Sequence, residues 1–72
     1  MDSEIRLLPK DVYTVGDLYD FKVKRPYATY CELIDEPNNI TTYLQGTAKL
    51  KLFKGQIVKC RVTAVSEKHP KI

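Results

Sequence analysis

The chain has 72 residues, of which 43% are hydrophobic and 29% charged, and it carries a net charge of +3. This composition is ordinary for one small globular domain, and the sequence contains no candidate membrane span because no long apolar run occurs. A charge of +3 is too small to indicate nucleic acid by itself. The first residues, MDSEIRLLPKD, mix acids, bases and a proline, so we expect no signal peptide. Residues 1–14 are interpreted as an N-terminal extension or linker, and residues 15–72 as one folded domain.

From Gly16 onward, apolar and polar side chains alternate, which is typical of half-buried β-strands. The first run, DLYDFKVKR, is expected to end or bend at Arg25-Pro26 because proline limits strand pairing. Its expected inward side chains are Tyr19, Phe21 and Val23. The second run, YATYCELID, is expected to bury Thr29, Cys31 and Leu33. The residues EPNN that follow it are a strong turn signal.

Two further strands are predicted in the second half of the chain. The third run, ITTYLQG, is expected to bury Ile40, Thr42 and Leu44. TAKLKLFKG is ambiguous, because its alternation suits a strand whereas Leu50 and Phe53 suit one helical turn. The fourth run, QIVKCRVTAV, is expected to bury Val58, Cys60 and Val62. SEKHP is another turn, and Lys71-Ile72 has the pattern of a fifth strand that is short or truncated.

Four or five short strands without a convincing helix predict an all-β fold. A small barrel is favoured over a sandwich, because a barrel removes exposed strand edges and 72 residues are few for two full sheets.

Neither the cysteines nor the acidic residues indicate a metal site or an active site. Cys31 and Cys60 lie 29 residues apart without a CxxC pair, so we expect reduced, buried thiols in a cytoplasmic protein, although the residues alone also allow a disulfide. His69 lies in a turn before a proline and is expected to be solvated. Because no serine, histidine or cysteine is arranged as a nucleophile and base, we predict no catalytic residues, no metal ligands and no cofactor.

Three motifs of the chain match the pattern of a known family. YATYCEL matches a strand that reads Y-G-A-F-V-D-L, TTYL lies where L-V-H-I is usual, and FKGQIVKCRVTAVSEKHPKI matches a fourth strand and its run into a fifth. Together they resemble the S-one RNA-binding domain, an OB-fold barrel named after a ribosomal small-subunit protein and related to cold-shock domains. The resemblance covers about residues 15–72, with Ala28 in place of a family glycine and Tyr43 in place of a histidine. It implies a five-stranded OB-fold-like barrel.

In that family, aromatic side chains of the second and third strands stack on RNA bases. By position, the resemblance implies that Tyr27, Tyr30 and Tyr43 form this platform. The alternation independently turns Tyr30 and Tyr43 outward, whereas it points Tyr27 toward the core unless the strand bends after Pro26. Tyrosine is also simply a good strand former, and the alternation alone does not separate the two explanations. The candidate phosphate-binding side chains are Lys22, Lys24, Arg25, Lys59, Arg61 and Lys71.

Positive charge is concentrated late in the chain, since residues 49–72 contain seven Lys or Arg and one Glu. We therefore predict a module of a larger protein that binds single-stranded nucleic acid with low sequence specificity. RNA is favoured over DNA as the partner, and no membrane partner is expected. The alternative is a protein-interaction or structural barrel whose tyrosines dock on another domain of the parent chain. The two hypotheses differ in whether Lys and Arg surround the tyrosines.

Overall fold

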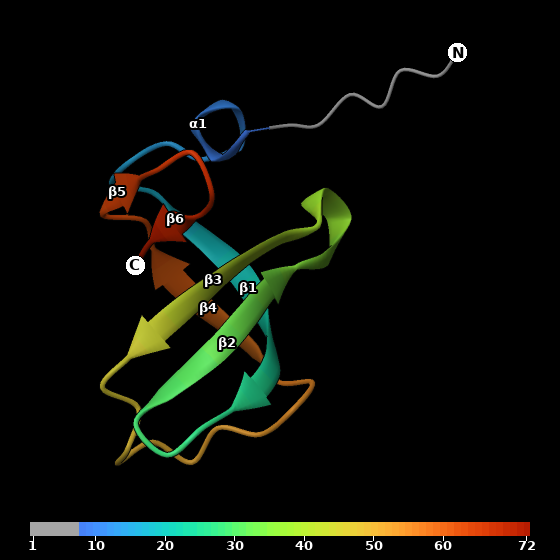
Figure 1. Cartoon of the computed structure of the whole chain (residues 1–72), viewed down its shortest axis with the longest axis vertical. Coiled ribbons are helices and arrows are strands. Elements are labelled where there is room, and N and C mark those ends of the chain that lie inside the picture. The colour runs from blue at the N-terminus through green and yellow to red at the C-terminus, as the bar shows by residue number, and fades with distance from the viewer. Residues whose placement is uncertain (1–7) are drawn as a thin grey trace.

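The computed structural model describes residues 8–72, and its strands form two antiparallel sheets (Figure 1). The larger sheet has the strand order β3-β2-β1-β4, and the smaller pairs β5 with β6. The strands are β1 (Leu18–Pro26), β2 (Tyr30–Asp35), β3 (Ile40–Gln45), β4 (Ile57–Arg61), β5 (Ala64–Val65) and β6 (Pro70–Lys71). A four-residue helix, α1 (Pro9–Val12), precedes them, and a 3-10 turn, η1 (Glu36–Asn38), joins β2 to β3.

The all-β prediction is confirmed, and the strands β1 to β4 fall at the four predicted runs. β1 extends to Pro26, and the fourth run, predicted as one strand, is divided into β4 and β5. The expected fifth strand is represented by β6, which is two residues long and pairs with β5. β6 also lies against β3, because the Thr42 hydroxyl donates a hydrogen bond to the carbonyl oxygen of Pro70 at 2.5 Å. Within residues 8–72, the strands do not close into a continuous hydrogen-bonded barrel.

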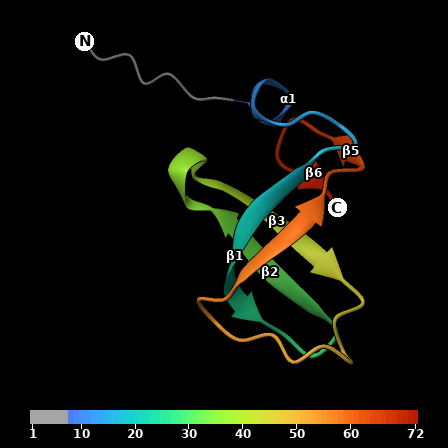
Figure 2. The same cartoon turned by 180° about the vertical axis from the view of Figure 1, so that it is seen from behind.

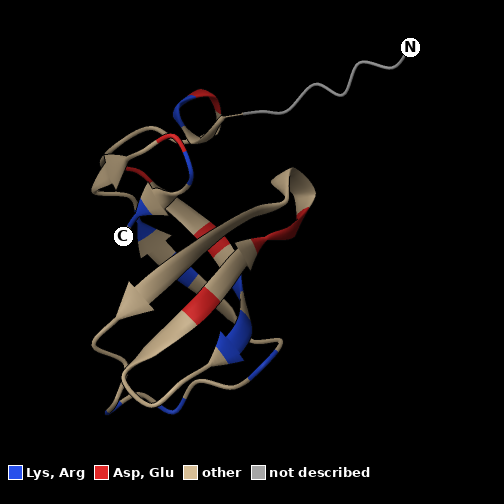
Figure 3. Ribbon diagram, viewed as in Figure 1, with Lys and Arg blue, Asp and Glu red and all other residues tan. Residues whose placement is uncertain are grey.

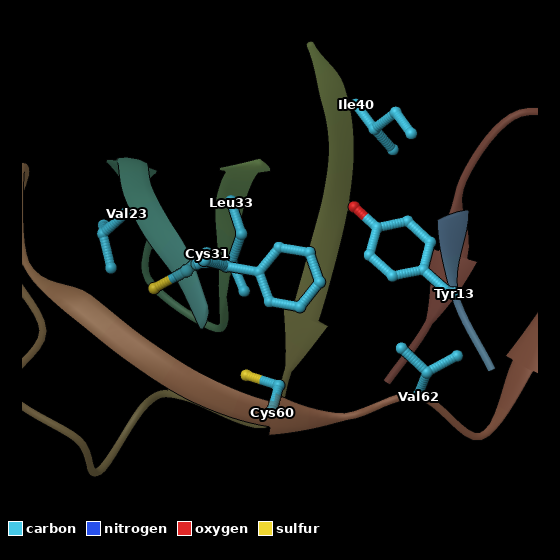
Figure 4. Close-up of a cluster of buried hydrophobic side chains, with 8 residues drawn as sticks. Tyr13, Val23, Cys31, Leu33, Ile40, Cys60 and Val62 are labelled. Atoms are coloured by element: carbon cyan, nitrogen blue, oxygen red, sulfur yellow. The ribbon is translucent and has the colours of Figure 1, made fainter. Parts of the chain in front are cut away.

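The large sheet folds over itself so that its two halves face each other. β2 and β3 lie in front of β1 and β4 in Figure 1, and the order reverses in Figure 2. The core fills the space between the halves (Figure 4). Its buried side chains are Tyr13, Phe21, Val23, Cys31, Leu33, Ile40, Cys60 and Val62. Both cysteines are buried and free, as expected from their place in alternating runs.

Residues 9–13, grouped with the N-terminal extension on sequence grounds, contribute to this core. Pro9 starts α1, where its missing N–H costs no hydrogen bond, and the Tyr13 N–H caps the helix on the Pro9 carbonyl at 2.9 Å. The Tyr13 ring then enters the core, where it packs edge-on against Tyr19 with ring centroids 4.9 Å apart. A helix this short has no amphipathic period in the sequence, which is why it was not predicted.

The turns on either side of β2 position its side chains. After β2, η1 ends at Asn39, whose left-handed backbone (φ 53°) reverses the chain, as the EPNN signal predicts. Before β2, the N–H of Tyr27 donates to the Tyr30 carbonyl at 2.8 Å and closes the turn from β1. The prediction that Thr29 points inward is wrong: Thr29 lies in this turn and is exposed, because strand alternation begins only at Tyr30.

The ambiguous segment between β3 and β4 forms neither a strand nor a helix, and we call residues 46–56 the 46–56 loop. Its start is held beside the β1–β2 turn, because the N–H groups of Gly46 and Thr47 both donate to the Thr29 carbonyl. Its end is held beside β1, where the Gly55 N–H donates to the Val23 carbonyl at 2.8 Å. The loop therefore runs around the end of the molecule that carries the β1–β2 turn, opposite α1 (Figure 1).

No helix in residues 8–72 has the length and apolar character needed to cross a membrane.

Candidate functional site

Four ring side chains from separate segments form a continuous row on the outer face of β2 and β3. We call Tyr27, Tyr30, Tyr43 and His69 the aromatic row. Tyr27 and Tyr30 are stacked, with ring centroids 4.6 Å apart and planes inclined by 19°. Tyr30 and Tyr43 follow at 6.2 Å and 59°, and Tyr43 meets His69 edge to face at 5.8 Å and 85°. The structure thus brings together all three tyrosines singled out in the sequence.

Sheet register explains why two of these rings are neighbours. Tyr30 lies opposite Gln45, and Glu32 lies opposite Tyr43, so Tyr30 and Tyr43 occupy diagonal positions on one face of the β2–β3 pair. Diagonal cross-strand positions are within reach of aromatic side chains. Cys31 and Leu33 are buried on the inner face of the sheet. Because successive side chains of a strand point to opposite faces, Tyr30 and Tyr43 point outward, as the alternation predicts.

Tyr27 faces solvent because it follows Pro26, the last residue of β1, and belongs to the turn. The alternative that it points into the core is excluded by its exposed fraction of 41%. Tyr43 has the same exposed fraction, whereas Tyr30 is half-buried because the Tyr27 ring covers one of its faces. Tyr27 and Tyr43 therefore offer the accessible ring surface, and Tyr30 supports them from between.

His69 is the member of the row that the sequence did not reveal. It is half-buried against Tyr43 rather than solvated. The Ser66 hydroxyl oxygen accepts hydrogen bonds from the N–H groups of Lys68 and His69, at 3.3 and 3.2 Å, and so shapes the turn that carries the imidazole. A serine two and three residues before such N–H groups is the local signal for this turn, but it says nothing of the contact with β3.

Three of the predicted strand cations are engaged with carboxylates. The ion pairs join Lys22 to Glu36 at 3.4 Å, Lys24 to Glu32 at 3.9 Å and Lys59 to Asp20 at 4.0 Å. Lys59 and Arg61 lie on β4, behind β2 and β3, and Arg61 donates to the Gly16 carbonyl. These two β4 side chains therefore do not frame the aromatic row.

Arg25 and Lys71 lie at opposite ends of the row. Arg25 is exposed at the end of β1, next to the turn that carries Tyr27. Lys71 is exposed on β6, two residues after His69. Neither takes part in an ion pair among residues 8–72.

The 46–56 loop supplies cations that the sequence analysis did not assign to the site. Lys49, Lys51 and Lys54 are all exposed, the loop contains no acidic residue, and none of the three forms an ion pair within the described part of the chain. Figure 3 shows Lys and Arg along this loop and at the adjoining end of β1. Positive charge thus gathers at the Tyr27 end of the row.

One carboxylate lies beside the aromatic row. Glu32 is directly opposite Tyr43 on the outer face, and its side chain is 19% exposed. Lys24 lies close enough to offset its charge, and a carboxylate at this position can accept hydrogen bonds from the amino groups of a stacked base. Flat rings flanked by cations at one end suit a planar, anionic ligand.

Among residues 8–72, no three His, Cys, Asp or Glu side chains gather in a way that could hold a metal ion. The burial of Cys60 raises the pKa of its thiol, which keeps this buried sulfur neutral and unreactive.

Comparisons with protein-family models, curated proteins and solved structures find no match to this chain.

Proposed function

We propose that the chain is a module that binds single-stranded nucleic acid by base stacking on the aromatic row, with little sequence specificity. The observation that carries this proposal is the row itself, in which Tyr27 and Tyr43 are each 41% exposed and are linked through Tyr30. Stacking contributes about 1–3 kcal/mol per base and tolerates any sequence, because every base has a flat face. Two accessible rings give weak binding, as is useful in one module among several.

Strand propensity alone does not account for the row. A tyrosine on an outer strand position needs no special explanation. Here, however, the rings come from a turn, from two strands and from the β5–β6 turn, and the centroids of successive rings lie 4.6 to 6.2 Å apart. Tyrosine suits an exposed stacking surface because its ring is apolar while its hydroxyl stays hydrated.

The proposed fold family is the OB-fold barrel of the S-one type, and the proposed preference for RNA rests on that resemblance. Two features support it. β1 pairs with both β2 and β4, and Thr42 holds β6 against β3. The buried free cysteines support a cytoplasmic setting.

Binding of fluorescent oligo-U and oligo-dT tests the proposal. We expect the Tyr27→Ala/Tyr43→Ala variant to bind roughly tenfold or more weakly than the wild type, because both accessible rings are lost. The matched Tyr27→Phe/Tyr43→Phe variant keeps the rings and should stay within about threefold of the wild type. Circular dichroism confirms that both variants are folded.

Two results would contradict the proposal. One is a folded wild-type protein that binds neither oligonucleotide at low salt. The other is equal binding by the alanine and phenylalanine variants, which would show that the rings are not the contact. Either result would favour the alternative, in which the same tyrosines dock on another domain.

A further inference from the structure

The lysines on the strand faces differ from those of the 46–56 loop in their neighbours. Lys22, Lys24 and Lys59 on the strand faces lie within 4.0 Å of carboxylates. Lys49, Lys51 and Lys54 in the 46–56 loop have no carboxylate partner within residues 8–72. A paired lysine must give up its partner before it can neutralise a phosphate, whereas an unpaired lysine contributes its full charge. The loop is therefore the better phosphate-binding element.

The loop also lies where a strand leaving the aromatic row would pass. Its first residues are hydrogen-bonded to Thr29, in the same turn as Tyr27. Its last residues are hydrogen-bonded to Val23, beside the end of β1 that carries Arg25. A chain of nucleotides stacked on Tyr43 and Tyr27 therefore reaches the loop directly beyond Tyr27.

Two apolar side chains of the loop remain uncovered. Leu50 is 55% exposed and Phe53 is 64% exposed, although neighbouring Leu52 packs against the core. An exposed phenyl ring among lysines matches the pattern of surfaces that bind single-stranded nucleic acid, where cations contact phosphates and rings stack on bases. The flat, exposed ring of Phe53 and the lysines on either side of it in the loop favour a nucleic acid over a lipid surface as the occupant.

We infer that the 46–56 loop is a second binding element, which contacts the phosphates of the nucleic acid through Lys49, Lys51 and Lys54 and stacks a further base on Phe53. This inference rests on the proposed function, because it extends the same bound strand beyond Tyr27. It assigns stacking mainly to the aromatic row and the salt-dependent part of the affinity mainly to the loop. The strand-face lysines predicted from the sequence then contribute little.

The test compares two triple variants that lose the same charge. The loop variant is Lys49→Ala/Lys51→Ala/Lys54→Ala, and the control, on α1, β1 and β4, is Lys10→Ala/Lys22→Ala/Lys59→Ala. Oligo-U binding is measured over a series of salt concentrations. The measured quantity is the slope of the logarithm of the binding constant against the logarithm of the salt concentration. We expect the magnitude of this slope to decrease by about 2 in the loop variant, at about 0.7 per phosphate contact, and to stay near the wild-type value in the control.

Phe53→Ala separates the ring from the charges. We expect it to weaken binding of an oligo-U of about eight nucleotides severalfold while leaving the salt slope and the affinity for about four nucleotides unchanged. Loss of the loop lysines should likewise remove most of the advantage of the longer oligonucleotide.

The failure of this inference differs from the failure of the proposed function. If Tyr27→Ala/Tyr43→Ala abolishes binding but the loop and control variants share one salt slope, the row binds nucleic acid and the loop does not. If the wild type binds no oligonucleotide but binds phosphatidylserine vesicles, and the loop variant loses that binding, the loop is a membrane-surface element and both proposals are wrong.

Discussion

Tyr13 shows how one side chain can tie the start of the described chain to the sheet. Its hydroxyl donates to Asp35 Oδ2 at 2.6 Å, and the Asn38 side-chain amide donates to the same oxygen at 2.9 Å. Burial raises the pKa of Tyr13 above its usual range, and the hydrogen bond to Asp35 and the charge of Asp35 add to this effect. The folded protein therefore holds Tyr13 neutral at a pH where the unfolded chain begins to lose that proton.

The sign of the pH dependence follows from this difference. Because the folded pKa is the higher one, the stabilisation is complete below the unfolded pKa of about 10 and is lost as pH rises beyond it. We expect Tyr13→Phe to lower the free energy of unfolding by about 1 kcal/mol at pH 7, since a hydrogen bond is removed. We also expect its stability to fall less steeply than that of the wild type above about pH 10. Urea unfolding at both pH values measures this, and equal alkaline slopes would contradict it.

At the scale of elements, the turn between β2 and β3 depends on one backbone conformation. Asn39 has φ 53°, in the left-handed region that costs most residues about 1 kcal/mol or more. We expect Asn39→Gly to change the free energy of unfolding by less than about 0.5 kcal/mol, and Asn39→Val to lower it by about 1–2 kcal/mol. Urea midpoints of the two variants provide the measurement, and a stable valine variant would show that the turn tolerates another conformation.

The strands could be predicted from the sequence because each buries one face. Phe21 and Val23, Cys31 and Leu33 are almost fully buried, as period-two alternation requires. Alternation did not predict the exposure of Thr29, the helix α1 or the path of the 46–56 loop. The helix and the turn at Thr29 are closed by local hydrogen bonds that have no period-two pattern, and the loop is positioned by bonds to distant backbone, such as those from Gly46 and Thr47 to Thr29. A short or truncated fifth strand was predicted at Lys71-Ile72, but its partners were not, since β6 depends on contacts with β3 and β5.

For the molecule as a whole, Thr42 provides a buried link between the two sheets. It is 0% exposed, and its hydroxyl donates to the Pro70 carbonyl across 28 residues of sequence. We expect Thr42→Val to cost about 1–3 kcal/mol, because the carbonyl loses its buried partner. Hydrogen exchange at the Thr63 amide, which donates to Lys71, should speed up as the β5–β6 pair loosens. Thr42→Ser keeps the hydroxyl and serves as the control; equal exchange in both variants would rule out the link.

The candidate site could be predicted in its chemistry but only partly in its arrangement. The alternation of the sequence predicted that Tyr30 and Tyr43 point outward, because both lie in regular strands. It did not decide the direction of Tyr27 or find His69, whose positions depend on turns. Nor could it separate free from paired lysines, since ion pairs such as Lys22–Glu36 join residues from different elements.

The stacked pair of Tyr27 and Tyr30 also gives the protein an optical reporter. The chain contains five tyrosines and no tryptophan, so phenol rings dominate its near-ultraviolet spectrum. Two chromophores held face to face, with centroids 4.6 Å apart, are close enough to couple their electronic transitions, so we expect the pair to contribute to the near-ultraviolet circular dichroism. A base that slides against Tyr27 would perturb this contribution and quench tyrosine emission. The proposed binding to this surface can therefore be tested by spectroscopy on the unlabelled wild-type protein.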